Sequence, residues 1–176
     1  MIGLKSGIVK LSSYDNEWQV LFNAEKELIK KQIGEFVLDI QHVGSTSIPG
    51  LESKPIIDIA VGVHPLDIGL QCIEPLVSVG YEYKNDAGIP GRHFFAKGSK
   101  ENRTHYLHIE VINGELWKNH ILFRDYILMH KAFITKYANL KRELASIYEN
   151  GRDSYTKGKD AFIKEVLYLA QIQQGI

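Results

Sequence analysis

One apolar stretch interrupted by a single carboxylate constrains the fold of this chain more than any other feature. Residues 54–63 read Lys-Pro-Ile-Ile-Asp-Ile-Ala-Val-Gly-Val, with Asp58 between two isoleucines. Apolar residues on both faces are typical of a strand that is covered on both sides, so we predict a central strand of a sheet here. A buried carboxylate is costly without a partner, and Asp58 therefore needs either a functional site or a structural ion pair.

The segment before this strand is rich in small polar residues. His42 to Gly50 reads His-Val-Gly-Ser-Thr-Ser-Ile-Pro-Gly, which indicates a strand that runs into a turn. Small residues leave backbone N–H groups accessible to phosphate oxygens, although an ordinary connection between strands also contains Gly and Ser. We interpret the segment as a phosphate-binding loop, whose candidate residues are Gly44, Ser45, Thr46 and Ser47.

The remaining sequence predicts an α+β fold. We expect a helix at 18–33, capped by Ser12 or Ser13 and ended by Gly34, and a second helix at 66–79. The expected strands are 36–43, 54–63, 81–84, 92–97 and 104–112. Turn-forming residues separate the last three of these strands, which favours antiparallel hairpins. Residues 115–174 are helical in pattern, with breaks near 130–131 and 150–151.

This order predicts a mixed, largely antiparallel sheet in residues 1–113, with a helical bundle in residues 114–176 packed on it as one compact domain. The chain has 176 residues, with 21 basic and 21 acidic side chains. That balance argues against a dedicated nucleic-acid-binding or membrane surface. Cys72 is the one cysteine, which excludes a disulfide framework, and we find neither a signal peptide nor a membrane span. We therefore expect a cytoplasmic protein.

The expected strand at 104–112 carries a second set of polar residues. Alternation puts Tyr106, His108 and Glu110 on one face and the residues between them on the other. If this strand lies beside the strand of Asp58, Glu110 or His108 stands next to that carboxylate and completes a metal site. The alternative is that Glu110 is a solvated strand residue and His108 a structural histidine.

Several basic side chains are candidate phosphate ligands. Lys54 begins the strand of Asp58, and Tyr155 and Lys159 are four residues apart, so they share a face of a helix. Arg124 offers a bidentate phosphate ligand if it faces the site, or a surface pair with Asp125. The basic residues of strand 92–97 fit an ordinary hairpin surface.

The spacing of the first motif resembles nucleotidyltransferases of the polymerase-beta-like superfamily. In that pattern Gly-Ser ends one strand and an Asp-x-Asp/Glu pair lies on the next. Here Gly44-Ser45 and Asp58 match, but Ala60 stands where the second carboxylate is expected. Since two divalent metal ions need at least two carboxylates between them, Asp58 alone cannot hold a metal pair.

Several motifs together resemble the GrpB family over residues 8–170. That resemblance implies a nucleotidyltransferase-like fold, without a settled reaction, and family members also carry an apolar residue where Ala60 stands. The matching segments are Tyr14-Asp15-x-x-Trp18, His42 to Leu51, Lys54 to Ile59, Thr104 to His108, Phe123 to Tyr126 and Tyr155-x-x-x-Lys159-x-Ala-Phe162.

We therefore expect a protein that binds a nucleoside triphosphate with Mg²⁺ or Mn²⁺ and transfers a nucleotidyl group to a hydroxyl of an unknown small-molecule or protein acceptor. In this hypothesis Asp58 and Glu110 hold the metal, and His42 or His108 removes the acceptor proton. The alternative is a non-catalytic nucleotide-binding or regulatory module that keeps the fold, which Ala60 favours.

Overall fold

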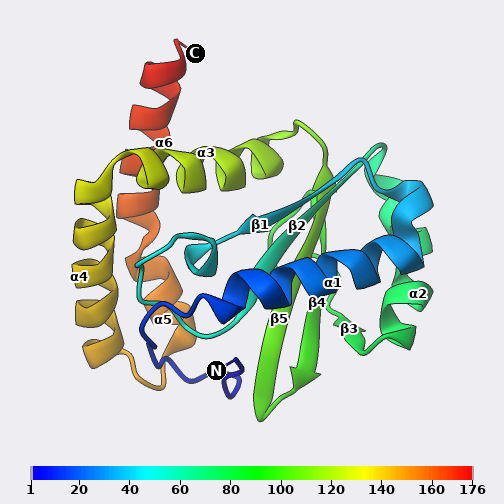
Figure 1. Ribbon diagram of the computed structural model, residues 1–176, viewed down its shortest axis with the longest axis horizontal. Helices are drawn as coiled ribbons and strands as arrows, with labels where there is room; N and C mark the ends of the chain where they lie inside the picture. The colour runs from blue at the N-terminus through cyan, green and yellow to red at the C-terminus, as the bar shows by residue number, and fades with distance from the viewer. Residues whose placement is uncertain (1, 176) are drawn as a thin grey trace.

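The computed structural model describes residues 2–175 (Figure 1). A five-stranded sheet has the order β1-β2-β5-β4-β3. Its strands are β1 (Asp39–Val43), β2 (Ile57–Val63), β3 (Tyr81–Tyr83), β4 (Arg92–Ser99) and β5 (Asn102–Val111). The α-helices are α1 (Glu17–Ile33), α2 (Ile73–Ser78), α3 (Glu115–Met129), α4 (Lys131–Ile147), α5 (Arg152–Gly158) and α6 (Asp160–Gln174). Short 3₁₀ turns cover Gly34–Phe36, Ser45–Ser47 and Leu66–Cys72.

The sheet is mixed and largely antiparallel, so the predicted α+β fold is confirmed. Strand β2 pairs with β5 in parallel, and the pairs β1–β2, β3–β4 and β4–β5 are antiparallel. The predicted hairpins are present, because β3, β4 and β5 follow one another across the sheet. The strand of Asp58 therefore lies beside the strand of His108 and Glu110, as the sequence analysis required.

Helix α1 covers one face of the sheet, and Figure 1 shows it lying across the strands. Its apolar residues Phe22, Ile29 and Ile33 are buried against the side chains of Ile57 and Ile59 on β2. Residues 57, 59 and 61 of β2 point to this face, so Asp58 and Ala60 point to the other.

Helix α3 covers part of that other face. Its Trp117 packs on Val43 of β1 and Ala60 of β2. Figure 1 shows α3, α4, α5 and α6 gathered on one side of the sheet, with α2 on the opposite side. Both faces of β2 are thus covered, which explains why its sequence is almost continuously apolar. No helix within residues 2–175 is both long and apolar enough to cross a membrane.

Several details of the helices differ from the sequence analysis. Of the helix expected at 66–79, Leu66–Cys72 form a 3₁₀ segment, and the α-helix covers only Ile73–Ser78. Ser12 forms a β-bridge with Ser53 and does not cap α1; instead Asp15 Oδ1 accepts a hydrogen bond from the backbone N–H of Glu17 at 3.0 Å. The predicted breaks near 130 and 150 are present, but a further break separates α5 from α6. There α5 approaches α4 so closely that a Cβ on Gly158 would lie 2.5 Å from Leu144 Cδ2.

Candidate functional site

A cavity of about 520 Å³ opens on the face of the sheet that carries Asp58. Strands β2, β4 and β5 and the turn at Ser45–Ser47 form one wall, and helices α3 to α6 form the other. This volume is within the range of small-molecule sites. The predicted site residues that line it are Gly44, Ser45, Thr46, Lys54, Asp58, His108, Glu110, Tyr155 and Lys159.

Gly44 brings the backbone of the turn against the carboxylate of Asp58. Its φ is +69°, and a Cβ at this position would lie 2.6 Å from Asp58 Oδ2. Both the backbone conformation and the space therefore require glycine. As the sequence predicts, the Gly-Ser turn lies next to Asp58, and both line the same cavity.

The structure favours an ionised Asp58. Burial acts to raise its pKa, but the hydrogen bond from His108, with a smaller contribution from the charge of Lys54, leaves the pKa below its usual value. The distance from Asp58 Oδ1 to His108 Nε2 is 3.5 Å, and 32% of the Asp58 side chain stays exposed. A negative oxygen is therefore available to a cation in the cavity.

Arg92 fixes the tautomer of His108. Its Nη1 donates to His108 Nδ1 at 3.0 Å, and since a guanidinium can only donate, Nδ1 carries the lone pair and Nε2 carries the proton. Burial lowers the pKa of His108 despite the nearby carboxylates, so the ring is neutral. Neither ring nitrogen of His108 offers a free lone pair in this arrangement.

Glu110 lies farther along the same face and has a different partner. Its Oε1 is 3.1 Å from His120 Nε2 on α3, and its side chain is only 1% exposed. In the register, Asp58 lies opposite Tyr106 and Glu110 lies opposite Gly62. Four residues of strand separate the two acids by roughly 13 Å at the Cα atoms. The expectation that Asp58 and Glu110 share one metal ion is therefore revised, because the register holds them too far apart.

The other end of the cavity is cationic. Lys54, Lys141, Arg152 and Lys159 line it, and in the part of the chain that the structure describes none of them has a carboxylate within 4.0 Å. Arg152 Nη1 donates to Tyr106 Oη at 2.7 Å, whereas its Nε and Nη2 are buried without a hydrogen-bond partner. The Nζ atoms of Lys54 and Lys159 lie 5.2 Å and 4.8 Å from the Tyr155 ring centroid.

Two of these lysines, the half-buried Lys54 and the buried Lys141, show how unfavourable this concentration of positive charge is. Burial, with the charges of Lys159 and Arg152, lowers the pKa of Lys54 to about 7. Burial, with the charge of Lys159, lowers the pKa of Lys141 to about 6, although its Nζ donates to the Glu52 carbonyl. An anionic ligand would relieve the repulsion between these groups.

Comparison with known proteins assigns the chain to a family. A family model described as "GrpB protein" matches residues 8–168. This chain belongs to the GrpB family. The "Glutamate-rich protein GrpB" of Alkalihalophilus pseudofirmus is 42% identical over 171 residues, which cover 95% of this chain and 98% of the relative.

A solved structure of the same family has the same fold. The crystal structure of conserved protein GrpB from Enterococcus faecalis is similar with a TM-score of 0.87 and 33% identity, and the match covers 95% of this chain and all of that one. A structure of Cid1 in complex with its short product ApU aligns over 76% of this chain and 39% of its own, with a TM-score of 0.44 and 20% identity. We transfer no function at that level of similarity.

His42 does not face the cavity of this GrpB protein, contrary to the sequence analysis. It pairs with Ile59 in the sheet register, so its ring points to the face that α1 covers and stacks on Phe22 with ring centroids 4.7 Å apart. His42 Nε2 is hydrogen-bonded to Thr46 Oγ1 at 3.0 Å, and burial lowers its pKa to about 4. This geometry gives His42 a structural role beneath the turn and removes it from the candidate catalytic residues.

Arg124 and Ser47 are also placed away from the cavity wall. Arg124 Nη1 donates to Gln41 Oε1 at 2.8 Å and to the His42 carbonyl at 2.9 Å, and its Nε contacts Asp125. Ser47 Oγ donates to the Gly44 carbonyl at 2.6 Å. Both side chains hold β1 and its turn in place, and their predicted phosphate contacts are not available in this arrangement.

Four further residues, Arg92, His120, Lys141 and Arg152, line the cavity and were not predicted as site residues. For three of them the helical spacing in the sequence gives an indication. Arg152 lies three residues before Tyr155 and seven before Lys159, and this spacing places all three side chains on the same face of a helix. Lys141 follows Tyr137 by four residues and interrupts an apolar stripe. His120 follows Trp117 by three residues on α3. Arg92 was assigned to a hairpin surface, because the sequence does not show which face of β4 is covered.

Proposed function

We propose that this GrpB protein binds a nucleoside triphosphate together with one Mg²⁺ ion in the cavity. The observation that carries the proposal is a cluster of cations without acidic partners among the described residues, next to an ionised carboxylate that remains accessible. Lys141 of this cluster is buried, and Lys54, Arg152 and Lys159 are half-buried. The negative charge of a triphosphate complements the cluster of cations, and the positive charge of a divalent metal ion complements the Asp58 carboxylate. The sequence resemblance to the polymerase-beta-like superfamily supports the same ligand.

The cationic end suits the phosphate groups. Arg152 presents two unsatisfied N–H groups there, and hydrogen bonds between charged partners stabilise more than neutral ones. Lys54 and Lys159 flank the ring of Tyr155, so their ammonium groups can contact oxygens of different phosphates. Ser45 and Thr46 also line the cavity.

Asp58 fits one Mg²⁺ ion but not two. Mg²⁺ in nucleotide sites is commonly held by one or two carboxylates, by phosphate oxygens and by water. Ala60 lies two residues after Asp58 on the same face of β2. Its side chain is fully buried against Val43 and Trp117 and offers no ligand atom to a second metal ion. The bound ion would supply charge neutralisation between Asp58 and the triphosphate.

Isothermal titration calorimetry with ATP, CTP, GTP and UTP, each with and without Mg²⁺, tests the binding step. We expect micromolar binding of at least one nucleotide, weakened when Mg²⁺ is removed or when Asp58 is replaced in Asp58→Asn. Absence of heat for all four nucleotides in both conditions would refute the proposal. The variant Asp39→Asn, on β1 and away from the cavity lining, is the matched control.

Nucleotidyl transfer is the activity that this binding would serve. The acceptor oxygen forms a bond to the α-phosphorus, the bond to the bridging oxygen breaks, and pyrophosphate leaves. The acceptor proton would pass to solvent, because His42 lies on the other face and His108 has no free lone pair. An α-labelled triphosphate incubated with cell extract should give a labelled product that Asp58→Asn abolishes.

A binding module without turnover is the second candidate, and Ala60 favours it. A superfamily enzyme uses a second carboxylate at this position, and its absence removes the second metal ligand. Nucleotide binding without a labelled product in the same assay would support the module.

A further inference from the structure

A second group of possible ligands lies in the same cavity, and one of its members, His108, is next to Asp58. One ligand atom each from His108, Glu110 and His120 can be chosen so that all three lie within 4.8 Å of one another. His108 and Glu110 come from the same face of β5, and His120 reaches them from α3, which packs on that face. The group thus joins the sheet to the helical layer, and all three residues line the cavity.

The most buried member of this group has an unused acceptor atom. The Glu110 side chain is 1% exposed, and its Oε2 has no hydrogen-bond partner. His108 is 7% exposed, and its protonated Nε2 lies 3.5 Å from Asp58 Oδ1. Buried polar atoms in native proteins are nearly always satisfied, so the unpaired Glu110 oxygen needs an explanation such as a bound cation.

We propose that His108, Glu110 and His120 bind one divalent transition-metal ion. Two imidazoles and one carboxylate suit Zn²⁺ and its neighbours, whereas Mg²⁺ prefers oxygen ligands only. Three protein ligands leave at least one coordination position, which here faces the cavity, as in catalytic rather than structural zinc sites. The ion differs in chemistry and position from the Mg²⁺ proposed at Asp58.

The two proposed sites are neighbours, because His108 Nε2 lies 3.5 Å from Asp58 Oδ1. Glu110 lies at the level of Gly62, four residues along the strand from the level of Asp58, so the carboxylate of the transition-metal site is a different one. Nucleotide binding is not required for this site to form. Titrations without nucleotide therefore test it alone, and their result has no bearing on triphosphate binding.

Arg92 opposes metal binding and gives the site a specific signature. The lone pair of His108 Nδ1 accepts a hydrogen bond from Arg92 Nη1 at 3.0 Å. If Nδ1 binds the metal, Arg92 competes for that lone pair. If Nε2 binds the metal, its proton must move to Nδ1, where Arg92 cannot accept it. Removal of Arg92 should therefore strengthen metal binding in either case.

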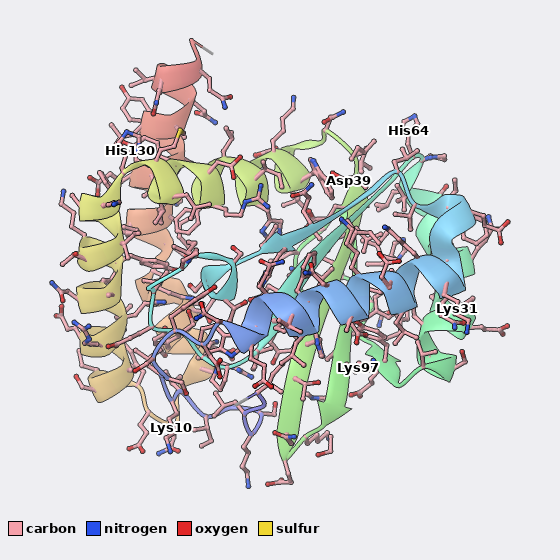
Figure 2. The ribbon with its side chains drawn as sticks, in the orientation of Figure 1. Lys10, Lys31, Asp39, His64, Lys97 and His130 are labelled. Carbon is pink, nitrogen blue, oxygen red and sulfur yellow. The ribbon has the colours of Figure 1, made fainter. Side chains whose placement is uncertain are left out.

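The first experiment is a Zn²⁺ titration of the full, untagged, chelator-treated chain in competition with a chromophoric chelator. We expect one equivalent to bind, and we expect Co²⁺ to give visible absorption bands with intensities typical of four or five ligands. The change His120→Gln should weaken binding by about 100-fold or more, since even groups outside the ligand shell change affinity by about 10–100-fold. His64→Gln, an exposed histidine labelled in Figure 2, should leave binding unchanged.

The second experiment uses Arg92→Gln, whose amide oxygen can accept from a protonated Nδ1. We expect its Zn²⁺ affinity to rise by about tenfold. Equal Zn²⁺ binding by the original chain, His120→Gln and His64→Gln would overturn the proposal, as would weaker binding by Arg92→Gln. The thermal midpoint of unfolding verifies folding of each variant, and Zn²⁺ should raise it for the original chain and not for His120→Gln.

Discussion

The two faces of the sheet bury charged side chains in opposite ways. On the face under α1, Glu25 accepts hydrogen bonds from Lys97 Nζ at 2.7 and 3.0 Å and from Tyr81 Oη at 2.7 Å. Figure 2 shows Lys97 in front of the strands beside α1. On the cavity face, Arg152 keeps two unsatisfied donors, and the lysines beside it have no acidic partner among the described residues.

Under the proposed function, the difference separates structural charges from charges that bind a ligand. A buried ion with a matched partner is part of the packing, and its loss is expected to affect folding. A buried ion without a partner lowers the stability of the free protein and is expected to affect binding. Variants on the two faces should therefore fall into two classes, one measured by unfolding and the other by ligand affinity.

The largest effect is expected for Glu25→Ala on the α1 face. Lys97 loses its counter-charge and Tyr81 loses its acceptor, so the free energy of unfolding should fall by about 3 kcal/mol. Urea unfolding followed by circular dichroism measures the change. Glu27→Ala on the same helix removes an exposed pair with Lys30 and should cost no more than about 0.5 kcal/mol. Equal losses for both variants would contradict the distinction.

Arg152→Gln on the cavity face should give the reverse result. Loss of a charged hydrogen-bond donor should weaken triphosphate binding by about 10–100-fold, whereas the free energy of unfolding should fall by no more than about 1 kcal/mol. Calorimetric titration and urea unfolding of the same preparation measure both quantities. Arg142→Gln, which removes an exposed arginine paired with Glu52, is the control and should keep the affinity. A large loss of stability with unchanged affinity would place Arg152 among the structural charges.

The smallest effect is a pH dependence set by Lys54 and Lys141. Their pKa values are lowered to about 7 and about 6, so both lose positive charge in the free protein as the pH rises from 6 to 8. Affinity for a Mg²⁺–triphosphate should then fall by at most about tenfold per lysine. The change Lys54→Met should flatten the profile, and an affinity that rises with pH in the original chain would contradict the assignment.

The same two lysines set the sign of the stability change. Between the lowered pKa and the ordinary value of 10.5, the unfolded chain holds protons that the folded chain has released. Stability therefore rises with pH in this interval, and the destabilisation by the charged lysines is complete only below about pH 6. Unfolding of the ligand-free protein at pH 6, 7.5 and 9 measures this trend.

The sequence was sufficient for the parts of the site that lie on strands. Alternation with a period of two places Tyr106, His108 and Glu110 on one face, and the apolar sequence around Asp58 identifies a central strand. The failure at His42 has a simple cause: whether His42 or Val43 faces the cavity depends on the register between β1 and β2. A shift of one residue exchanges the two faces, and the sequence does not specify that register.

The helical side of the site was less predictable. Arg152, Lys141 and His120 belong to helices whose packing partners are distant in sequence, so a charged side chain there fits solvent as well as a cavity. Arg124 shows the reverse error: it is a plausible phosphate ligand in the sequence, but in the structure its Nε and Nη1 donate to Asp125, Gln41 and the His42 carbonyl, away from the cavity lining. Only the docking of α3, α5 and α6 on the sheet decides which cations remain without partners.

The two walls of the cavity come from distant parts of the chain, and this has a consequence for how the protein matures. Asp58 belongs to β2, whereas Arg152 and Lys159 come about a hundred residues later, at the start of α5 and directly after its end. During synthesis the residues of the sheet are made before most of the cations of the cavity. Under the proposed function, the phosphate-binding wall is therefore completed last, when the final helices pack on the strands.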